Sequence, residues 1–291
     1  MERPQIGYIG VGLMGLPMVQ RLVSLGYPVV ACDIAPDRLG AAARAGARPA
    51  SSPHAAVHGA EFVLLNLPTT AAVEQAVFGE RGLADALRPP QLLVDFSTIE
   101  VESCKSFAVR LRDTTGCGWV DAPVSGGPPA SAAGSLTVMA GGAAEDIERL
   151  QSLMADVASR FTRAGPSGSG LAVKMINQLI VGCGHAVMAE ALLLAEAAGL
   201  DASRIPECLA GGYADSALLQ RLYPRMLRRD FAPQGYARQL LKDMEMVNGL
   251  AAELKAPVPM TAAALSLYRM LIHLGYAELD SAGLFKLYER N

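Results

Sequence analysis

The sequence contains few of the residues that identify several common classes of protein. Its five cysteines are an odd number spread over 291 residues, and no two of them have the Cys-x-x-Cys spacing. This argues against a disulfide framework and against a zinc or redox motif, so we expect free, buried thiols and no metal site. His54 and His58 are four residues apart, but no carboxylate motif accompanies them, and a solvated helix face is the favoured interpretation.

Charged and aromatic residues are also scarce. They make up 18% and 5% of the chain, and the formal net charge is −3. This leaves no basic surface for nucleic acid or for an anionic membrane. The chain opens without a charged segment followed by an apolar run, so we expect no secretory signal and a cytoplasmic protein. The most apolar stretch, residues 179–200, contains His185, Glu190 and Glu196 and is interpreted as a core helix.

Apolar residues, by contrast, make up 51% of the sequence, which is ample for a large core. In the first half, short apolar runs alternate with alanine-rich helical patterns, and this alternation predicts βαβ units with a parallel sheet. The strands are expected at residues 5–9, 29–33, 62–67, 92–96, 118–121 and 136–140, and the helices at 13–24, 37–45, 71–77 and 145–158.

The pattern changes at residues 165–170, where three glycines, a proline and two serines exclude a long regular element. After this segment only helical patterns follow, at residues 171–198, 202–210, 217–228, 234–254, 260–274 and 281–290. We therefore predict an α/β fold in two domains. Residues 1–165 form a Rossmann-type doubly wound sheet, and residues 166–291 form an all-helical domain.

A glycine motif lies between the first predicted strand and the first predicted helix. Its spacing is that of a dinucleotide-binding G-x-G-x-x-G loop. The first glycine permits a tight turn, the second lets the backbone approach a pyrophosphate, and the third permits close packing of helix on strand. The free N–H groups of the helix N-terminus would bind the phosphates. The predicted cofactor-binding residues of this loop are Gly10, Val11, Gly12, Leu13, Met14 and Gly15.

Asp33 ends the second predicted strand, 18 positions after Gly15, where a carboxylate can accept hydrogen bonds from the adenosine ribose. A 2′-phosphate beside it would bring two negative charges together, at a cost of about 1 kcal/mol at 4 Å even in water. The next residue is Ile34, which offers no guanidinium to a phosphate. NAD is therefore the expected cofactor, while Arg38 leaves NADP open as the alternative.

Beyond the glycine loop, the chain resembles the β-hydroxyacid dehydrogenase family, which includes 3-hydroxyisobutyrate dehydrogenase and tartronate semialdehyde reductase (2-hydroxy-3-oxopropionate reductase). The resemblance covers nearly the whole chain. It is carried by residues 10–18 (opening loop), 121–127 and 134–142 (substrate-binding signature), 170–178 (catalytic helix) and the pairs 242–243 and 280–281. It implies hydride transfer between a nicotinamide cofactor and a small β-hydroxyacid or its semialdehyde. It also implies an active site between the domains and a homodimer or homotetramer, in which the long helix after residue 170 could bury its free face.

The segment Ser125-Gly126-Gly127 offers a hydroxyl group and unhindered backbone N–H groups, which suit a small carboxylate. Taken alone it is better explained by an ordinary turn. The resemblance implies that these three residues bind the carboxylate of the substrate.

Lys174 lies at the start of an apolar helical pattern, where a lysine either extends its amine to solvent or serves a site. The resemblance implies that it is the acid/base of the hydride transfer, since an amine can give a proton to the forming alcohol and take it back in the reverse direction. Gln178 follows four residues later on the same helix face. The resemblance places Asn177 and Gln178 at the substrate.

Further cofactor contacts follow from the resemblance. The turn Leu67-Pro68-Thr69 matches the family's Leu-Pro turn under the cofactor, and Thr98 lies in a Ser-Thr-Ile turn near the nicotinamide ribose. Both turns follow strands at the edge where open α/β sheets bind ligands. Lys242 matches a second lysine that reaches the cofactor, although, taken alone, a solvated helix charge is the favoured interpretation.

The substrate and two alternative functions stay open. Pro129 and Gln178 favour a tartronate semialdehyde reductase over a 3-hydroxyisobutyrate dehydrogenase, whereas Ala130 stands where the former group typically has lysine. An imine reductase of the same fold is the alternative enzyme, and Lys174 argues against it because those enzymes usually lack this lysine. A non-catalytic protein on the same scaffold would not need the glycine loop, residues 125–127 and Lys174 together.

Overall fold

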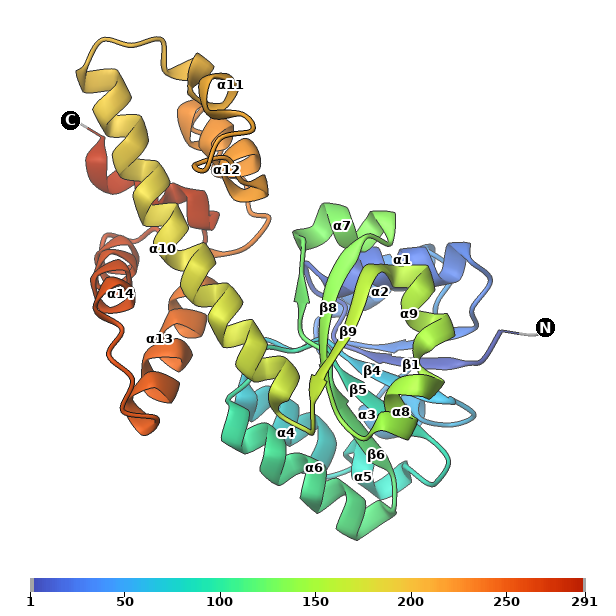
Figure 1. Cartoon of the computed structure of the whole chain (residues 1–291). Coiled ribbons are helices and arrows are strands. Elements are labelled where there is room, and N and C mark those ends of the chain that lie inside the picture. The colour runs from blue at the N-terminus through green and yellow to red at the C-terminus, as the bar shows by residue number, and fades with distance from the viewer. Residues whose placement is uncertain (1–2, 290–291) are drawn as a thin grey trace. The chain divides into compact units, whose positions relative to one another are not determined.

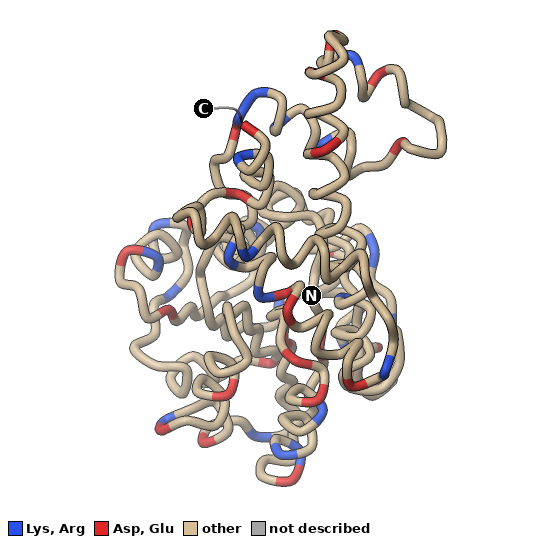
Figure 2. The backbone as a smooth tube through the Cα atoms, turned by 90° about the vertical axis from the view of Figure 1, so that its left-hand side faces the viewer, with Lys and Arg blue, Asp and Glu red and all other residues tan. Residues whose placement is uncertain are grey.

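The computed structural model describes residues 3–289 and consists of two compact units, which divide in sequence between Lys174 and Met175. The long helix α10 (Ser169–Ala197) begins in the first unit and ends in the second. The predicted domain boundary after residue 165 lies shortly before this helix. Basic and acidic residues are interspersed along the described chain (Figure 2).

A nine-stranded sheet forms the centre of the first unit (Figure 1). Its strand order is β3-β2-β1-β4-β5-β6-β8-β7, with β9 paired to β8. The strands from β3 to β6 are parallel, which is the arrangement expected when strands alternate with helices. They are β1 (Ile6–Ile9), β2 (Val29–Cys32), β3 (Arg48–Pro49), β4 (Phe62–Leu65), β5 (Leu92–Asp95) and β6 (Gly118–Asp121). The predicted α/β class is confirmed.

The far end of the sheet differs from the prediction. β8 (Leu136–Gly141) lies antiparallel to β6 and to the short β7 (Val124–Ser125). β9 (Ala158–Gly165) pairs parallel with β8, although the sequence pattern predicts no strand there. None of its eight residues is fully buried, so β9 lacks the apolar alternation that reveals a strand in a sequence.

Helices cover both faces of the sheet. Figure 1 shows α1, α2 and α9 on one side and α4, α5 and α6 on the other. Ile6 and Tyr8 of β1 share one core cluster with Met18 and Leu22 of α1, as the alternation of side chains along a strand requires. These helices are α1 (Gly15–Ser24), α2 (Pro36–Arg44), α3 (Pro53–Ala56), α4 (Thr70–Phe78), α5 (Leu83–Ala86), α6 (Val101–Thr115), α7 (Gly127–Ala133), α8 (Ala144–Arg149) and α9 (Gln151–Val157). The single helix predicted at 145–158 is wrong, because the chain bends at the buried Leu150 between α8 and α9.

The second unit is helical in its described part, as predicted. After α10 come the 3₁₀ turn η1 (Ala202–Arg204), α11 (Ile205–Leu209), α12 (Ala217–Leu227), α13 (Ala237–Glu253), α14 (Pro259–His273) and the 3₁₀ segment η2 (Ser281–Tyr288). The helix predicted at 281–290 is therefore a 3₁₀ segment, and its last predicted residue lies outside the described residues. The Asp280 carboxylate accepts from the backbone N–H of Ala282 at the start of η2 and pairs with Arg225 of α12 at 3.0 Å.

All five cysteines are free. Cys32, Cys104 and Cys117 are buried and Cys183 is half-buried, but Cys208 is exposed. The expectation of buried thiols is wrong for Cys208, because it lies on the short helix α11, most of whose side chains face solvent.

Candidate functional site

The glycine loop after β1 has the shape that its sequence predicts. Gly10 has φ +94°, in the left-handed region that favours glycine, and a Cβ on it would collide with the backbone oxygen of Asn66. A Cβ on Gly15 would collide with the backbone oxygen of Gly10, so the first turn of α1 packs directly on the loop. Both glycines are therefore required by the protein's own packing.

Gly12 is different, because a Cβ there would meet no backbone. The nearest atom would be Nη1 of the flexible Arg38, at 3.7 Å. The surface beside Gly12 is open at the N-terminus of α1, where free backbone N–H groups and the helix dipole favour an anion. The loop thus fits a dinucleotide pyrophosphate, with Gly12 leaving the space that the phosphates would need.

Asp33 is held at the end of β2 by two backbone groups. Its Oδ2 accepts from the N–H of Val11 at 2.7 Å and its Oδ1 from the N–H of Ala35 at 2.8 Å. Each carboxylate oxygen keeps a lone pair for a ribose hydroxyl. The sequence pattern predicts the ribose contact but not the hydrogen bond from Val11. Through this bond Asp33 also stabilises the glycine loop.

The turns after β4 and β5 are joined by a side chain. Ser97 Oγ accepts from the backbone N–H of Leu67 at 2.8 Å, and the N–H of Ser97 donates to Oδ1 of the buried Asp95 at 2.9 Å. Pro68 and Thr98 lie in these same turns, and Thr69 caps α4 by accepting from the N–H of Ala72 at 3.1 Å. Sequence reasoning named Thr98 for this site but missed that Ser97 joins the two turns.

Ser125, Gly126 and Gly127 connect β7 to α7. Gly126 has φ +131° and Gly127 has φ +70°, and a Cβ on Gly126 would lie 2.6 Å from that of Ala130. Glycines leave their backbone N–H groups unhindered by side chains, and such N–H groups can bind an anion. The segment therefore suits the small carboxylate that the sequence analysis expects there.

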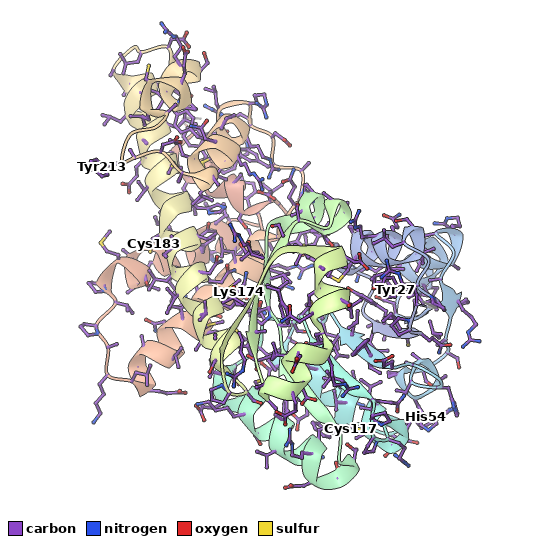
Figure 3. All side chains as sticks on the ribbon, turned by 45° about the vertical axis from the view of Figure 1, so that its right-hand side comes forward. Tyr27, His54, Cys117, Lys174, Cys183 and Tyr213 are labelled. Atoms are coloured by element: carbon purple, nitrogen blue, oxygen red, sulfur yellow. The ribbon has the colours of Figure 1, made fainter. Side chains whose placement is uncertain are left out.

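Lys174, labelled in Figure 3, is buried in the early part of α10 with only 7% of its surface exposed. Its Nζ donates to the backbone oxygen of Val124 at 2.7 Å, directly before Ser125. The amine therefore does not extend to solvent, which removes the simplest structural explanation of this lysine. The structure brings Lys174 to the same segment as the candidate carboxylate site.

In the second unit, Asn177 and Gln178 are linked to Asp243 of α13. The Gln178 Nε2 donates to Asp243 Oδ2 at 2.5 Å, and Asn177 Nδ2 donates to Gln178 Oε1 at 2.8 Å. Lys242 Nζ lies 3.1 Å from Asp243 Oδ1. Because a carboxylate only accepts, Asp243 fixes the orientation of the Gln178 amide. Asp243 is absent from the predicted site, although it directly follows Lys242 in a motif that the resemblance singles out.

Other candidate residues take structural roles. His185 is buried, its Nδ1 lies 2.8 Å from the backbone oxygen of Val181, and burial lowers the pKa of its ring. The rings of His54 and His58 pack edge to face. Between residues 3 and 289, no three His, Cys, Asp or Glu side chains are grouped so that they could hold a metal ion.

Comparison with known proteins identifies two family models along the chain. Residues 5–165 match the NAD-binding domain of 6-phosphogluconate dehydrogenase, and residues 168–288 match the NAD-binding domain of NADP-dependent 3-hydroxyisobutyrate dehydrogenase. A 2-hydroxy-3-oxopropionate reductase of Escherichia coli is 31% identical over 287 residues, covering 98% of this chain and 97% of the relative. An NAD-dependent L-serine dehydrogenase of Pseudomonas aeruginosa is 33% identical over 292 residues, covering 98% of each.

Solved structures give the same picture. The 3-hydroxyisobutyrate dehydrogenase of Mycobacterium tuberculosis with L-serine has a TM-score of 0.87 and 27% identity, covering 99% of this chain and 100% of that one. An imine reductase from Pseudomonas sp. has a TM-score of 0.65 at 21% identity, with coverage of 99% and 100%, which shows the fold alone.

The open space at Gly12 gives a test of the dinucleotide site. We expect Gly12→Ala to fold with an unchanged free energy of unfolding, since its Cβ meets only a mobile side chain. Its dissociation constant for NADH should rise by about tenfold, equivalent to about 1.4 kcal/mol, because the methyl group occupies the phosphate space. Gly249→Ala on α13, where a Cβ meets nothing within 4 Å, is the control. Unchanged NADH binding by Gly12→Ala in a fluorescence titration would contradict this placement.

Proposed function

Since the chain belongs to the β-hydroxyacid dehydrogenase family, we propose that it transfers a hydride between NAD and a small β-hydroxyacid or its semialdehyde, with Lys174 as the acid/base. The family makes it a nicotinamide-dependent oxidoreductase acting on a hydroxyl group. The single observation that best supports the catalytic assignment is the burial of Lys174 against Val124, next to the Ser-Gly-Gly turn. A surface lysine would have no reason to lose its hydration there.

Each residue has a role in this proposal. When bound, the nicotinamide ring accepts or supplies the hydride. The backbone at Ser125, Gly126 and Gly127 binds the substrate carboxylate and so places the hydroxyl-bearing carbon. The Lys174 ammonium donates a proton to the carbonyl oxygen during reduction, and the neutral amine accepts the hydroxyl proton during oxidation. Asn177 and Gln178 are assigned to the substrate.

The cofactor contacts in the proposal follow the carboxyl ends of the strands. Gly10, Val11, Gly12, Leu13, Met14 and Gly15 hold the pyrophosphate, Asp33 holds the ribose, and the turns containing Leu67, Pro68, Thr69 and Thr98 lie under the nicotinamide half. Lys242 is assigned to the cofactor from the second unit, where its Nζ lies 3.1 Å from Asp243 Oδ1.

The proposed substrates are small acids with a hydroxyl group at the β-carbon. Relatives named for 2-hydroxy-3-oxopropionate, L-serine and 3-hydroxyisobutyrate all match this chain at 30–33% identity. An imine reductase is the alternative enzyme, and the similarity to one extends to the fold only.

The role of Lys174 is tested by Lys174→Met. With NAD and a panel containing glycerate, 3-hydroxyisobutyrate and L-serine, the wild-type enzyme should form NADH with at least one acid, followed at 340 nm. Lys174→Met should lose at least about a hundredfold of that rate, the range typical of a general acid/base. Its NADH dissociation constant should stay unchanged, because the glycine loop is intact.

The matched control is Lys255→Met, which removes an exposed lysine just after α13. It should keep the wild-type rate. Substantial activity in Lys174→Met would remove Lys174 from the mechanism. A wild-type enzyme that is silent with every acid but reduces a cyclic imine would favour the alternative enzyme.

The preference for NAD over NADP rests on the end of β2. Asp33 places a negative charge where the 2′-phosphate of NADP would lie, and the Ile34 side chain next to it is fully exposed. The Arg38 side chain approaches Gly12, with Nη1 3.7 Å from where a Cβ on that glycine would lie, and in this proposal it serves the pyrophosphate side of the loop.

Ile34→Arg should therefore change the cofactor preference. A guanidinium at this exposed position can pair with a 2′-phosphate, and the ratio of kcat/KM for NADP to that for NAD should rise by about tenfold or more. Ile34→Leu, which adds no charge, should leave the ratio unchanged. A wild-type enzyme that already prefers NADP would contradict the assigned role of Asp33.

We further propose that the chain forms a homo-oligomer through α10. One face of this helix is buried, with Ala189 and Leu192 in a core cluster of the second unit. The other face carries an exposed apolar row, which we call the α10 seam, made of Val173, Ile176, Ile180, Val187 and Leu194.

A second copy of the chain is the occupant that this seam fits. Four of its residues are spaced by seven, the repeat of paired helices. The pairs 173/194 and 180/187 are both centred between Cys183 and Gly184, halfway along α10, where Cys183 is labelled in Figure 3. A two-fold axis at this point would match the seam to itself, as a symmetric dimer requires.

Light scattering should accordingly give a multiple of the 30.5 kDa chain mass for the wild-type protein. Ile180→Glu should give the monomer, because a buried pair of glutamates would repel at the centre of the interface. Val109→Glu, at an exposed apolar position of α6 outside the seam, should leave the oligomer intact. A monomeric wild-type protein at micromolar concentration would contradict the proposal.

A cytoplasmic location also belongs to the proposal. Among the described helices, α10 alone is long and apolar enough to cross a bilayer by length and composition. Its buried face packs in the helical unit and it carries Glu190 and Glu196, which supports a core and interface helix rather than a membrane span.

A further inference from the structure

The N-terminal turn of α10 is capped by a carboxylate that comes from the sheet. Asp121, the last residue of β6, is completely buried. Its Oδ1 accepts from the backbone N–H of Gly168 at 2.7 Å, and its Oδ2 accepts from that of Leu171 at 3.0 Å. These N–H groups belong to the set that a helix start cannot satisfy within the helix itself.

Two glycines make room for this contact. A Cβ on Gly141 would lie 2.6 Å from Asp121 Oδ1, and a Cβ on Gly170 would lie 2.9 Å from Asp121 Oδ2 and would also collide with the backbone oxygen of Met139. Gly141 is the register partner of Asp121 in the sheet. The start of α10 therefore lies directly against the backbone of β6 and β8.

A buried carboxylate is a costly way to cap a helix. Burial raises the pKa of Asp121, and hydrogen bonds from backbone N–H groups act against this rise. Ser167 and Ser169 flank the helix start, and a serine cap would avoid burying a charge. The Asp121 carboxylate, unlike a serine of the helix itself, also fixes the position of α10 relative to β6.

The same strand end also holds the amine. Val124, three residues after Asp121, provides the backbone oxygen that accepts from Lys174 Nζ. Lys174 lies one turn beyond Gly170 on the capped helix. Segment 121–124 thus contacts α10 at two places. Asp121 accepts from the backbone of its first turn, and Val124 accepts from the end of the Lys174 side chain.

We propose that Asp121 is a positioning residue: by capping α10 it sets the place of Lys174 relative to the Ser125–Gly127 turn. This inference rests on the role of Lys174 in the proposed function. Asp121 touches neither substrate nor cofactor in it. Loss of the cap lets the first turn of α10 shift, and the Lys174 amine loses its alignment with the reacting oxygen.

Asp121→Asn tests the proposal, because it keeps the shape but turns one N–H acceptor into a donor. The expected result is a fall in kcat on the order of 10- to 100-fold, as for other misplaced catalytic groups, with KM for the acid and the NADH dissociation constant within about twofold of wild type. Asp121→Ser, which removes the charge, adds no bulk and keeps one hydroxyl oxygen as an acceptor, should show the same pattern and stands in if Asp121→Asn does not fold.

Asp146→Asn is the matched control for the loss of a buried carboxylate. Asp146 is 8% exposed on α8 and pairs with Arg149 at 3.6 Å, so this variant should lose stability but keep its kcat. A folded Asp121→Asn with wild-type kcat would overturn the proposal. Parallel losses of kcat and NADH affinity would also overturn it, because they indicate that the variant disrupts the structure as a whole. Activity in Lys174→Met would instead overturn the proposed function, so the two failures are distinguishable.

Discussion

The buried contact between Asp121 and the first turn of α10 organises the chemistry of the first unit. The segment that begins with this carboxylate continues through the oxygen that accepts from Lys174 and into the turn at Ser125–Gly127. One strand end therefore places the helix, the amine and the candidate carboxylate site together. Gly141 and Gly170 leave no space for an added carbon, so this contact requires glycine at both positions.

The cofactor side of the site depends on the backbone shape of the glycine loop and on the hydrogen bond from Val11 to Asp33. Gly10 and Gly15 are dictated by packing within the loop, whereas the space at Gly12 faces outward. Asp33 has two tasks, since it holds the N–H of Val11 and also lies where a ribose is expected. A substitution of Asp33 would therefore change both the glycine loop and the preference between NAD and NADP. A substitution of the exposed Ile34 changes the cofactor preference without removing the bond to Val11.

Much of the fold could be predicted because the strands and helices that bury apolar faces leave periodic patterns. The exposed β9 leaves none, and neither does the bend at Leu150. The glycine loop could be found from spacing, but Lys174 required the family resemblance, since a lone lysine on an apolar helix has no distinguishing pattern. Asp121 and Asp243 lie in motifs of the resemblance, but their contacts could not be predicted because their partners lie 47 to 65 residues away in sequence.

The central claim is that this protein moves a hydride directly from the hydroxyl-bearing carbon of a small acid to the nicotinamide. The most direct measurement uses the acid that the enzyme oxidises, with deuterium at that carbon, and analyses the reduced cofactor by mass spectrometry. Direct transfer should place one deuterium in each molecule of reduced cofactor and should slow the hydride-transfer step. Unlabelled reduced cofactor, with the deuterium released to water, would contradict it.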